Sequence, residues 1–260
     1  MVIIKLNYDN IAFCGDIHGN FSKLVNYIKI VRITNCVIFI CGDFGIGFNK
    51  EQFYIDEFNK LSKILEKHNV LIAAIRGNHD NPKYFKEIKY YGNFLLIPDY
   101  TIIEVNNKNI LALGGAISVD RYQRKIDMQK QLKYAKTIKH ECYWVDEEFI
   151  LNENILSNTS NIDIVFSHSC PSFCPPFTKG IMLDYIDRDK SLIEDCAKER
   201  INFTKAFDII YKYNPKLSNW YYGHFHSSHK INVNDVNFTC LDIMEIYMIN
   251  SGYDDIFMDK

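Results

Sequence analysis

The chain has 260 residues, of which 47% are hydrophobic and 24% charged, and its formal net charge is -2. This composition is ordinary for a globular protein, and 30 basic against 32 acidic side chains create no global attraction to nucleic acid or to a membrane surface. We expect a single domain over residues 1–260, because α/β proteins of this length are commonly one domain.

The first third of the chain alternates between strand and helix patterns. Apolar runs at Ile11–Cys14, Cys36–Cys41 and Val70–Ile75 predict buried strands. The segments between them, Phe21–Ile33 and Phe53–Lys67, carry apolar residues at helical spacing. Continuous apolar strands separated by helices are typical of a sheet that is covered on both faces.

Beyond Asp80 the pattern changes to short strands joined by turns. The runs Phe94–Ile97, Ile102–Val105 and Ile110–Leu113 predict a meander. A helix is expected at Glu147–Leu156.

The C-terminal part of the chain predicts a second sheet and one long helix. Ile162–Phe166 is an apolar run typical of a buried strand, and Leu192–Tyr213 has apolar residues in helical register. The closing strands are expected at Trp220–Tyr222, Lys230–Val233 and Val236–Leu241, followed by a tail over Asp254–Lys260.

The cysteines and the apolar runs bear on the cellular compartment. Eight cysteines without a C-x-x-C pair argue against a zinc ribbon or a redox dithiol, so free thiols are expected. The start, Met1–Asn7, turns polar too soon for a signal peptide, and no apolar run approaches the roughly 18 residues of a membrane span. We expect a cytoplasmic protein that does not associate with membranes.

Polar side chains that can bind metal ions follow five of the apolar runs. Asp16 and His18 leave one turn, so an oxygen and a nitrogen ligand can meet at one ion. The carboxylate of Asp43 can bridge two cations about 3.5 to 4 Å apart. The remaining ligand candidates supply oxygen and nitrogen without any thiolate, which suits two divalent transition-metal ions: Asn78, His168, His224 and His226.

A pair of such ions is typical of hydrolysis of phosphate esters. A water held between two dications is deprotonated near neutral pH, and both ions stabilise charge on a phosphoryl oxygen. We therefore expect attack by a hydroxide that bridges the metals. His79 follows a ligand directly and is expected to protonate the leaving group as a general acid, with phosphate binding as its alternative role.

The order D-x-H, G-D, G-N-H-D, H, G-H-x-H resembles the calcineurin-like metallophosphoesterase superfamily over residues 15–226. Gly114–Asp120, followed by Arg124 and Trp144–Glu148, is similar to a bacterial and phage branch of it. The resemblance implies an α/β fold of two facing mixed sheets flanked by helices, a four-layer sandwich. It assigns one ion to Asp16, His18, Asp43 and His226, and the other to Asp43, Asn78, His168 and His224. Manganese is the ion we expect, and Fe, Zn, Co or Ni would also suit these ligands.

The substrate is less well defined by the motifs. Protein serine/threonine phosphatases carry an aspartate and an arginine soon after the second Gly-Asp, whereas Phe44–Phe48 offers neither, so protein phosphatase activity remains only an alternative. Arg76 and Arg124 are candidate substrate contacts, and structural or surface ion pairs are their alternative roles.

A basic segment, Arg121–Lys139, is predicted to be a solvated helical excursion. It holds seven basic residues against one acid, Asp127, and this local charge of about +6 favours a phosphodiester, nucleotide or nucleic acid substrate. An alternative of another class is a binding module that keeps the fold without catalysis, but every expected ligand position and His79 are filled, which favours the enzyme. The sequence predicts no oligomeric state.

Overall fold

The computed structural model describes residues 2–135, 141–177 and 182–249. In chain order the elements are β1 (Ile3–Lys5), β2 (Asn10–Cys14), α1 (Phe21–Val31), β3 (Cys36–Ile40), α2 (Glu51–His68), β4 (Val70–Ala74), the 3₁₀ helix η1 (Pro82–Phe85), β5 (Lys89–Tyr91), β6 (Phe94–Leu96), β7 (Ile102–Val105), β8 (Lys108–Leu113), α3 (Arg121–Ala135), α4 (Glu153–Ser157), β9 (Ile164–Ser167), α5 (Leu183–Ile186), α6 (Leu192–Tyr213), β10 (Asn219–Tyr222), β11 (His229–Val233), β12 (Val236–Cys240) and β13 (Ile246–Ile249).

These strands form two mixed sheets. One has the order β13-β2-β3-β4-β6-β5, with parallel pairing from β2 through β3 and β4 to β6. The other has the order β1-β7-β8-β9-β10-β12-β11, with parallel pairing from β8 through β9 and β10 to β12. Antiparallel strands, β13 and β5 in the first sheet and β11 in the second, complete these edges.

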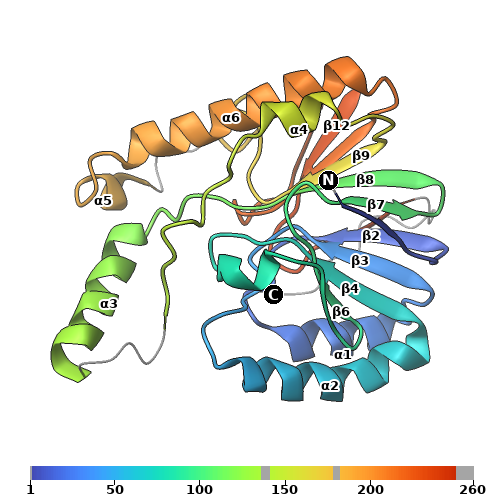
Figure 1. Ribbon diagram of the computed structural model, residues 1–260, viewed down its shortest axis with the longest axis horizontal. Helices are drawn as coiled ribbons and strands as arrows, with labels where there is room; N and C mark the ends of the chain where they lie inside the picture. The colour runs from blue at the N-terminus through green and yellow to red at the C-terminus, as the bar shows by residue number, and fades with distance from the viewer. Residues whose placement is uncertain (1, 136–140, 178–181, 250–260) are drawn as a thin grey trace.

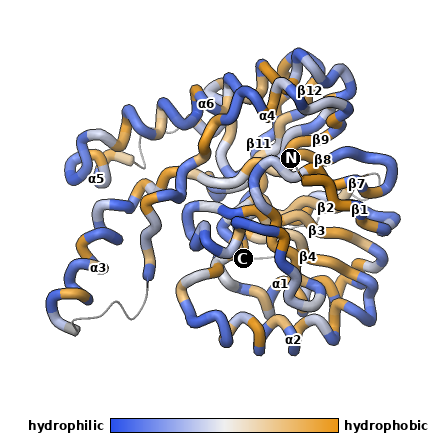
Figure 2. The backbone as a smooth tube through the Cα atoms, in the orientation of Figure 1, coloured by the Kyte–Doolittle hydropathy of each residue, from blue (hydrophilic) through white to orange (hydrophobic). Residues whose placement is uncertain are grey.

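Three hydrophobic cores make the architecture four layers deep (Figure 1). Side chains alternate along each strand, so Ile38 packs with Phe58 on the layer of α1 and α2, while its neighbour Phe39 packs with Phe166 between the sheets. On the outer face of the other sheet, Trp220 lies in the core covered by α6. Figure 2 shows the central strands as the most hydrophobic part of the chain. The expected fold of two facing mixed sheets flanked by helices is confirmed.

Three predicted helices, which correspond to α1, α2 and α6, begin and end close to their predicted bounds. The long helix α6 spans Leu192–Tyr213, as predicted. Helix α1 ends at Val31, because Arg32 has a left-handed backbone with φ 58°, and α2 ends before Asn69, with φ 51°. A left-handed residue ends a helix while its N–H still satisfies one of the last carbonyl groups.

The predicted meander is wrong. The three apolar runs are strands, but β6 pairs in parallel with β4 in one sheet, whereas β7 and β8 form an antiparallel hairpin in the other. The chain crosses between the sheets after Ile97, whose N–H still bonds to the carbonyl of Ala74 at 2.9 Å. Apolar spacing identifies a strand but does not reveal which sheet it joins.

The helix predicted at Glu147–Leu156 is also wrong over most of its length, since α4 begins only at Glu153. The guanidinium of Arg76 donates to the carbonyl oxygens of Asp146, Glu147 and Glu148 at 3.2, 2.7 and 3.0 Å. Three successive carbonyls that converge on one side chain cannot also point along a helix axis. A distant arginine therefore overrides the local helical pattern.

The remaining sequence expectations have mixed outcomes. All eight cysteines are free thiols, and Cys14, Cys36 and Cys41 are buried on strands or directly after them. None of the helices within the described ranges combines the length and the apolar character that a bilayer span needs. The predicted tail over residues 254–260 lies outside the described residues. Helix α3 extends away from the two sheets (Figure 1), as expected for the basic excursion.

Candidate metal centre

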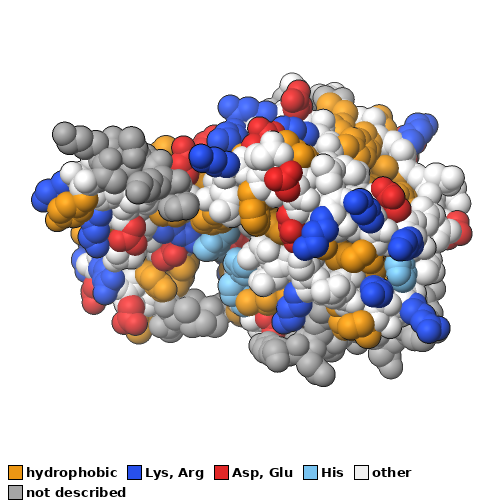
Figure 3. Space-filling model, turned by 90° about the horizontal axis from the view of Figure 1, so that it is seen from below, with side chains coloured by type: hydrophobic (Ala, Val, Ile, Leu, Met, Phe, Trp, Pro, Cys, Tyr) orange, Lys and Arg blue, Asp and Glu red, His pale blue; other side chains and the backbone are white. Residues whose placement is uncertain are grey.

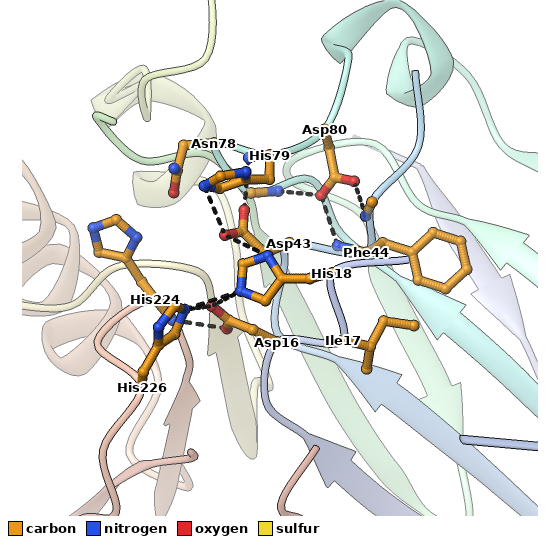
Figure 4. A network of polar contacts seen from close by, with 12 residues as sticks. Asp16, Ile17, His18, Asp43, Phe44, Asn78, His79, Asp80, His224 and His226 are labelled. Carbon is orange, nitrogen blue, oxygen red and sulfur yellow. Dashed lines mark hydrogen bonds and ion pairs between the residues drawn. The ribbon is translucent and has the colours of Figure 1, made fainter. Parts of the chain in front are cut away.

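The residues predicted to bind metal lie where strands of both sheets end (Figure 4). The loops after β2, β3 and β4, which are parallel neighbours in one sheet, meet the loops after β9 and β10, parallel neighbours in the other. Carboxyl ends of parallel strands share one edge of a sheet, which is where α/β proteins place their ligands. These loops carry Asp16, His18, Asp43, Asn78, His168, His224 and His226.

Four of these residues have a left-handed backbone. Their φ angles are 45° at His18, 48° at Asp43, 68° at His224 and 48° at His226. This conformation costs a residue other than glycine roughly 1–2 kcal/mol, and such strain is typically retained at functional sites. Here it turns each side chain toward the common centre.

Two glycines allow the loops to approach the ligand side chains. A Cβ on Gly77 would lie 2.2 Å from Asp43 Oδ1 and 2.7 Å from His168 Nε2. A Cβ on Gly223 would lie 2.2 Å from Asp16 Oδ1. Any side chain at either position would displace a predicted ligand.

The first group of ligand candidates is closely clustered. One ligand atom from each of Asp16, His18, Asp43 and His226 lies within 4.8 Å of the other three. His226 Nε2 is 2.9 Å from Asp16 Oδ2 and 3.0 Å from His18 Nε2. Two imidazoles and two carboxylates around one point suit a divalent transition metal, and this is the set that the resemblance assigns to one ion.

The second group meets at His168. Its Nε2 lies 3.2 Å from Asp43 Oδ1 and 3.0 Å from Asn78 Oδ1. Its Nδ1 lies 2.7 Å from the carbonyl oxygen of Cys41, a contact that fixes the ring and directs Nε2 to the centre. The His224 ring lies 4.9 Å from the His168 ring, centroid to centroid. Asp43 belongs to both groups, since its Oδ2 also lies 3.8 Å from His18 Nδ1.

The buried histidines and carboxylates at the centre shift one another's pKa values. Burial opposes ionisation of Asp43, but the neighbouring His168, His79 and His18 hold its pKa well below the usual range. Burial likewise disfavours a charged His168, yet Asp43 and Asp16 raise its pKa to about 10. Burial, with His168 close by, lowers the pKa of His224 to about 3. A cation bound here would replace the proton on His168, because metal ligation requires a neutral imidazole.

Asp80 joins the two loops that carry Asp43 and Asn78. Its Oδ2 accepts from the N–H groups of Phe44 and Gly77 at 2.9 and 2.8 Å. Its Oδ1 accepts from Gly45 and Ile46 at 2.7 and 3.0 Å. Burial raises the pKa of Asp80 to about 6, and Asp43 adds to this effect. In Figure 4 the dashed lines from the Asp80 carboxylate end at backbone nitrogens, so Asp80 holds the loops together.

His79 lies at the edge of the centre beside Arg124. The N–H of His79 donates to Asp43 Oδ1 at 2.7 Å, and Arg124 Nη2 contacts both ring nitrogens, with Nδ1 at 3.0 Å. Asp120 Oδ1 lies 2.8 Å from Arg124 Nε. Burial lowers the pKa of His79 to about 4. The negative charge of Asp43 opposes this shift, and the positive charge of Arg124 adds to it. The structure therefore brings one predicted substrate contact, Arg124, to the predicted catalytic residue.

Arg76, the other predicted substrate contact, occupies a structural position. Only 6% of it is exposed, and its Nε and Nη2 donate to Asp99 Oδ2 at 3.1 and 2.8 Å. Its Nη1 and Nη2 also donate to the carbonyls of residues 146–148. These contacts leave no donor for a phosphate. These contacts favour the structural ion pair as the role of Arg76.

Two cavities meet at His79, and Figure 3 shows histidine side chains at the wall of a hollow. The larger cavity, of about 460 Å³, extends from Asp43 and Asn78 to Tyr185 and Phe225. The smaller, of about 330 Å³, borders His18 and contains aromatic residues such as Phe48. His79 thus lines both cavities beside the ligand candidates.

The basic segment carries less free charge than predicted. Arg121 pairs with Asp189 and Asp195 at 2.6 and 2.5 Å, and Lys130 lies 3.3 Å from Asp127. Arg124 pairs with the preceding Asp120. Residues 136–139, with two of the lysines, lie outside the described residues. Three of the five basic side chains of α3 are thus paired, and the pairs of Arg121 and Arg124 with acids outside the segment reduce the charge of about +6 that favoured a polyanionic substrate.

Sequence reasoning missed the roles of Asp80 and Asp120. Asp80 lies in the motif around Asn78, but a carboxylate that accepts four backbone N–H groups leaves no pattern in the sequence. Asp120 is spaced i, i+4 from Arg124, a helical ion-pair spacing that signals the pair without revealing its position beside His79.

The comparison with protein families agrees with this arrangement. The family model described as calcineurin-like phosphoesterase matches residues 10–228. Among solved structures, TT1561 of Thermus thermophilus is similar at 10% identity and a TM-score of 0.42, covering 92% of this chain and 93% of that chain. A cold-active protein-tyrosine phosphatase of a psychrophilic Shewanella is similar at 12% identity and 0.37, covering 96% and 78%. GAP50, the anchor in the inner membrane complex of Plasmodium, is similar at 16% identity and 0.36, covering 90% and 71%.

Proposed function

The chain belongs to the calcineurin-like phosphoesterase family, and from that premise we propose that it is a single-domain enzyme that hydrolyses phosphate mono- or diesters with two divalent metal ions. The observation that carries the proposal is the position of Asp43. One of its oxygens lies 3.2 Å from His168 Nε2 and the other lies 3.8 Å from His18 Nδ1. A single buried carboxylate thus faces both groups of ligand candidates.

The donor set supports a pair of transition-metal ions. We propose that Asp16, His18, Asp43 and His226 hold one ion, and that Asp43, Asn78, His168 and His224 hold the other. Oxygen and imidazole donors without thiolate suit Mn²⁺ first, with Fe, Zn, Co and Ni as alternatives. Ions held there would supply an activated water and positive charge beside the phosphoryl oxygens.

We propose that Arg124 and His79 serve the substrate side of the centre. The permanent charge of Arg124 binds a phosphoryl oxygen, while Asp120 holds the guanidinium in place. His79 donates its proton to the oxygen of the leaving group. Burial and Arg124 both disfavour a charged His79, so the negative charge of a bound phosphoryl group must offset them. Asp120 and Arg124 would then replace the aspartate and arginine that are missing after Asp43.

Metal removal tests this proposal. Protein stripped with chelator should be inactive toward nitrophenyl phosphate and bis-nitrophenyl phosphate and should regain activity with Mn²⁺ or another transition metal. Asp43→Asn should reduce activity and metal content far more than Lys230→Ala, because Asp43 faces both ligand groups. Full activity in chelator, or no bound metal after reconstitution, would refute the metal centre.

The substrate class requires a direct screen. Cyclic and linear nucleotides, short RNA and phosphopeptides should be compared on the reconstituted enzyme at two salt concentrations. The paired arginines of α3 weaken the charge argument for nucleic acid, while the Arg124 contact restores a phosphate-binding group that protein phosphatases share. Hydrolysis of nucleotides or RNA that weakens with salt would favour the diester alternative, and a preference for phosphopeptides would favour the protein phosphatase.

A further inference from the structure

A buried chain of polar groups leads away from Asn78. Asn78 Nδ2 donates to Ser118 Oγ at 3.1 Å, and Ser118 Oγ donates to Glu147 Oε2 at 2.8 Å. The N–H of Ser118 donates to the other carboxylate oxygen, Oε1, also at 2.8 Å. The exposed fractions are 4% for Asn78, 0% for Ser118 and 3% for Glu147, so water does not compete for these groups.

We propose that Glu147 is a positioning residue that sets the orientation of the Asn78 amide, so that its oxygen faces the metal centre and its nitrogen faces Ser118. This inference rests on the proposed function, in which Asn78 Oδ1 is a metal ligand. An asparagine can turn its amide by 180° at little steric cost, and the two orientations present either an oxygen or an NH₂ group to the centre. Only the oxygen can bind a cation.

The direction of each hydrogen bond follows from the carboxylate. An ionised Glu147 only accepts, so it takes both the N–H and the single hydroxyl proton of Ser118. The Ser118 oxygen then has no proton to donate to Asn78 and can only accept a hydrogen bond from it. The amide must offer its NH₂ group there, which places Oδ1 on the other side, 3.0 Å from His168 Nε2. Turning the amide would set two acceptors against each other in a buried site.

Glu147 is itself held in place through its backbone carbonyl. Arg76 Nη1 donates to this carbonyl oxygen at 2.7 Å, and the N–H of Ala116 donates to the same oxygen at 3.1 Å. The N–H of Gly115 donates to the carbonyl of Arg76 at 2.8 Å. The loop that carries Ser118 and the extended segment that carries Glu147 are thus tied to the residue that begins the Asn78 motif.

This arrangement gives a role to two motifs that the metal ligands leave unexplained. Gly114–Asp120 supplies Ser118, and Trp144–Glu148 supplies Glu147. A Cβ on Gly115 would lie 2.7 Å from both Arg76 Nη1 and the Glu147 carbonyl oxygen, so the close passage of these segments requires glycine there. The two motifs and Arg76 form one support for the Asn78 side of the centre.

The test uses Glu147→Gln, with Glu148→Gln as a matched control because the Glu148 side chain is exposed. A glutamine can donate its NH₂ group to Ser118 Oγ, which frees the hydroxyl proton to donate to Asn78 and favours the turned amide. Mn²⁺ should be titrated calorimetrically into chelator-stripped protein at pH 8, above the pKa of about 7 to which burial raises Glu147. We expect two binding events in the wild type, of which one weakens by about 10- to 100-fold in Glu147→Gln while Glu148→Gln matches the wild type.

A second substitution separates orientation from general damage. In the Glu147→Gln background, Asn78→Asp should restore the weakened event, because one carboxylate oxygen accepts the freed Ser118 hydroxyl and the other faces the metal. In the wild-type background the same aspartate sets an oxygen against Ser118 Oγ without a proton between them, so its gain should be smaller. Urea unfolding of the metal-free proteins checks that each variant is folded, and Ser118→Ala replaces Glu147→Gln if that variant is not.

Two results would overturn the inference: unchanged binding in a folded Glu147→Gln, or an equal effect of Asn78→Asp in both backgrounds. A wild-type protein that binds no metal would instead refute the proposed function on which the inference rests.

Discussion

Replacing Asp80 by asparagine should destabilise the protein strongly, although Asp80 is no predicted metal ligand. Its two oxygens accept four backbone N–H groups, two each. Asparagine keeps one oxygen and turns an NH₂ group toward the other pair of donors. Two buried N–H groups lose their acceptor in either orientation of the amide, at about 1–3 kcal/mol each. The expected loss is about 2–6 kcal/mol, a large part of the stability of a typical domain.

Urea unfolding of the metal-free protein measures this loss. The comparison should be made at pH 8, above the pKa of about 6 to which burial raises Asp80, so that the wild-type group is ionised. The midpoint should fall without a change in slope. Asp56→Asn is the matched control, because Asp56 is exposed on α2 and should change stability by less than about 0.5 kcal/mol. A loss below about 1 kcal/mol for Asp80→Asn would mean that the loops relax, and that Asp80 does not hold them.

Three further predictions concern other residues of the centre and its surroundings. His79→Asn should lower kcat by about 10² to 10⁴ with metal content unchanged, and less for nitrophenyl than for alkyl esters, since nitrophenolate needs no proton; equal losses would favour phosphate binding by His79. Arg76→Ala should cost about 3–5 kcal/mol in urea unfolding, because it removes the buried guanidinium that pairs with Asp99 and donates to three carbonyls; a change within about 0.5 kcal/mol would contradict its structural role. Burial raises the pKa of Glu199 to about 8. Between the unfolded pKa near 4.5 and this value, the folded state keeps a proton on Glu199 that the unfolded state has released. The free energy of unfolding should therefore fall by about 1.4 kcal/mol per pH unit as the pH rises through this range. Glu199→Gln should remove this slope, and parallel pH profiles for the two proteins would contradict it.

The clustering of the ligand candidates could be predicted from the sequence because each motif is short and contiguous. Asp16 with His18, and His224 with His226, each leave one turn, so their proximity is decided locally. The strands before these turns are uniformly apolar, and parallel packing brings their ends together. Local pattern and global fold therefore point to the same place.

The arginines illustrate what local pattern leaves open. Arg76 lies inside the Asn78 motif, yet its side chain turns away to Asp99 and to carbonyls of residues 146–148. Arg124 lies far along the chain and reaches His79 because α3 begins beside the centre. Each of these side chains can reach partners several ångströms apart, and tertiary packing determines which partner it contacts.

The contacts of Arg76 with residues 146–148 explain both the wrong helix prediction before Glu153 and the unpredicted position of Glu147. The segment before Glu153 has a helical pattern, but Arg76 takes its carbonyls and holds it extended. That extended course is what brings the carboxylate of Glu147 within 2.8 Å of Ser118. A helix over Glu147 would turn successive carbonyls along its own axis, and Arg76 would lose its acceptors. The extended segment thus places the buried Glu147 next to the Asn78 side of the centre. Departures from local sequence pattern are expected at functional sites such as this one.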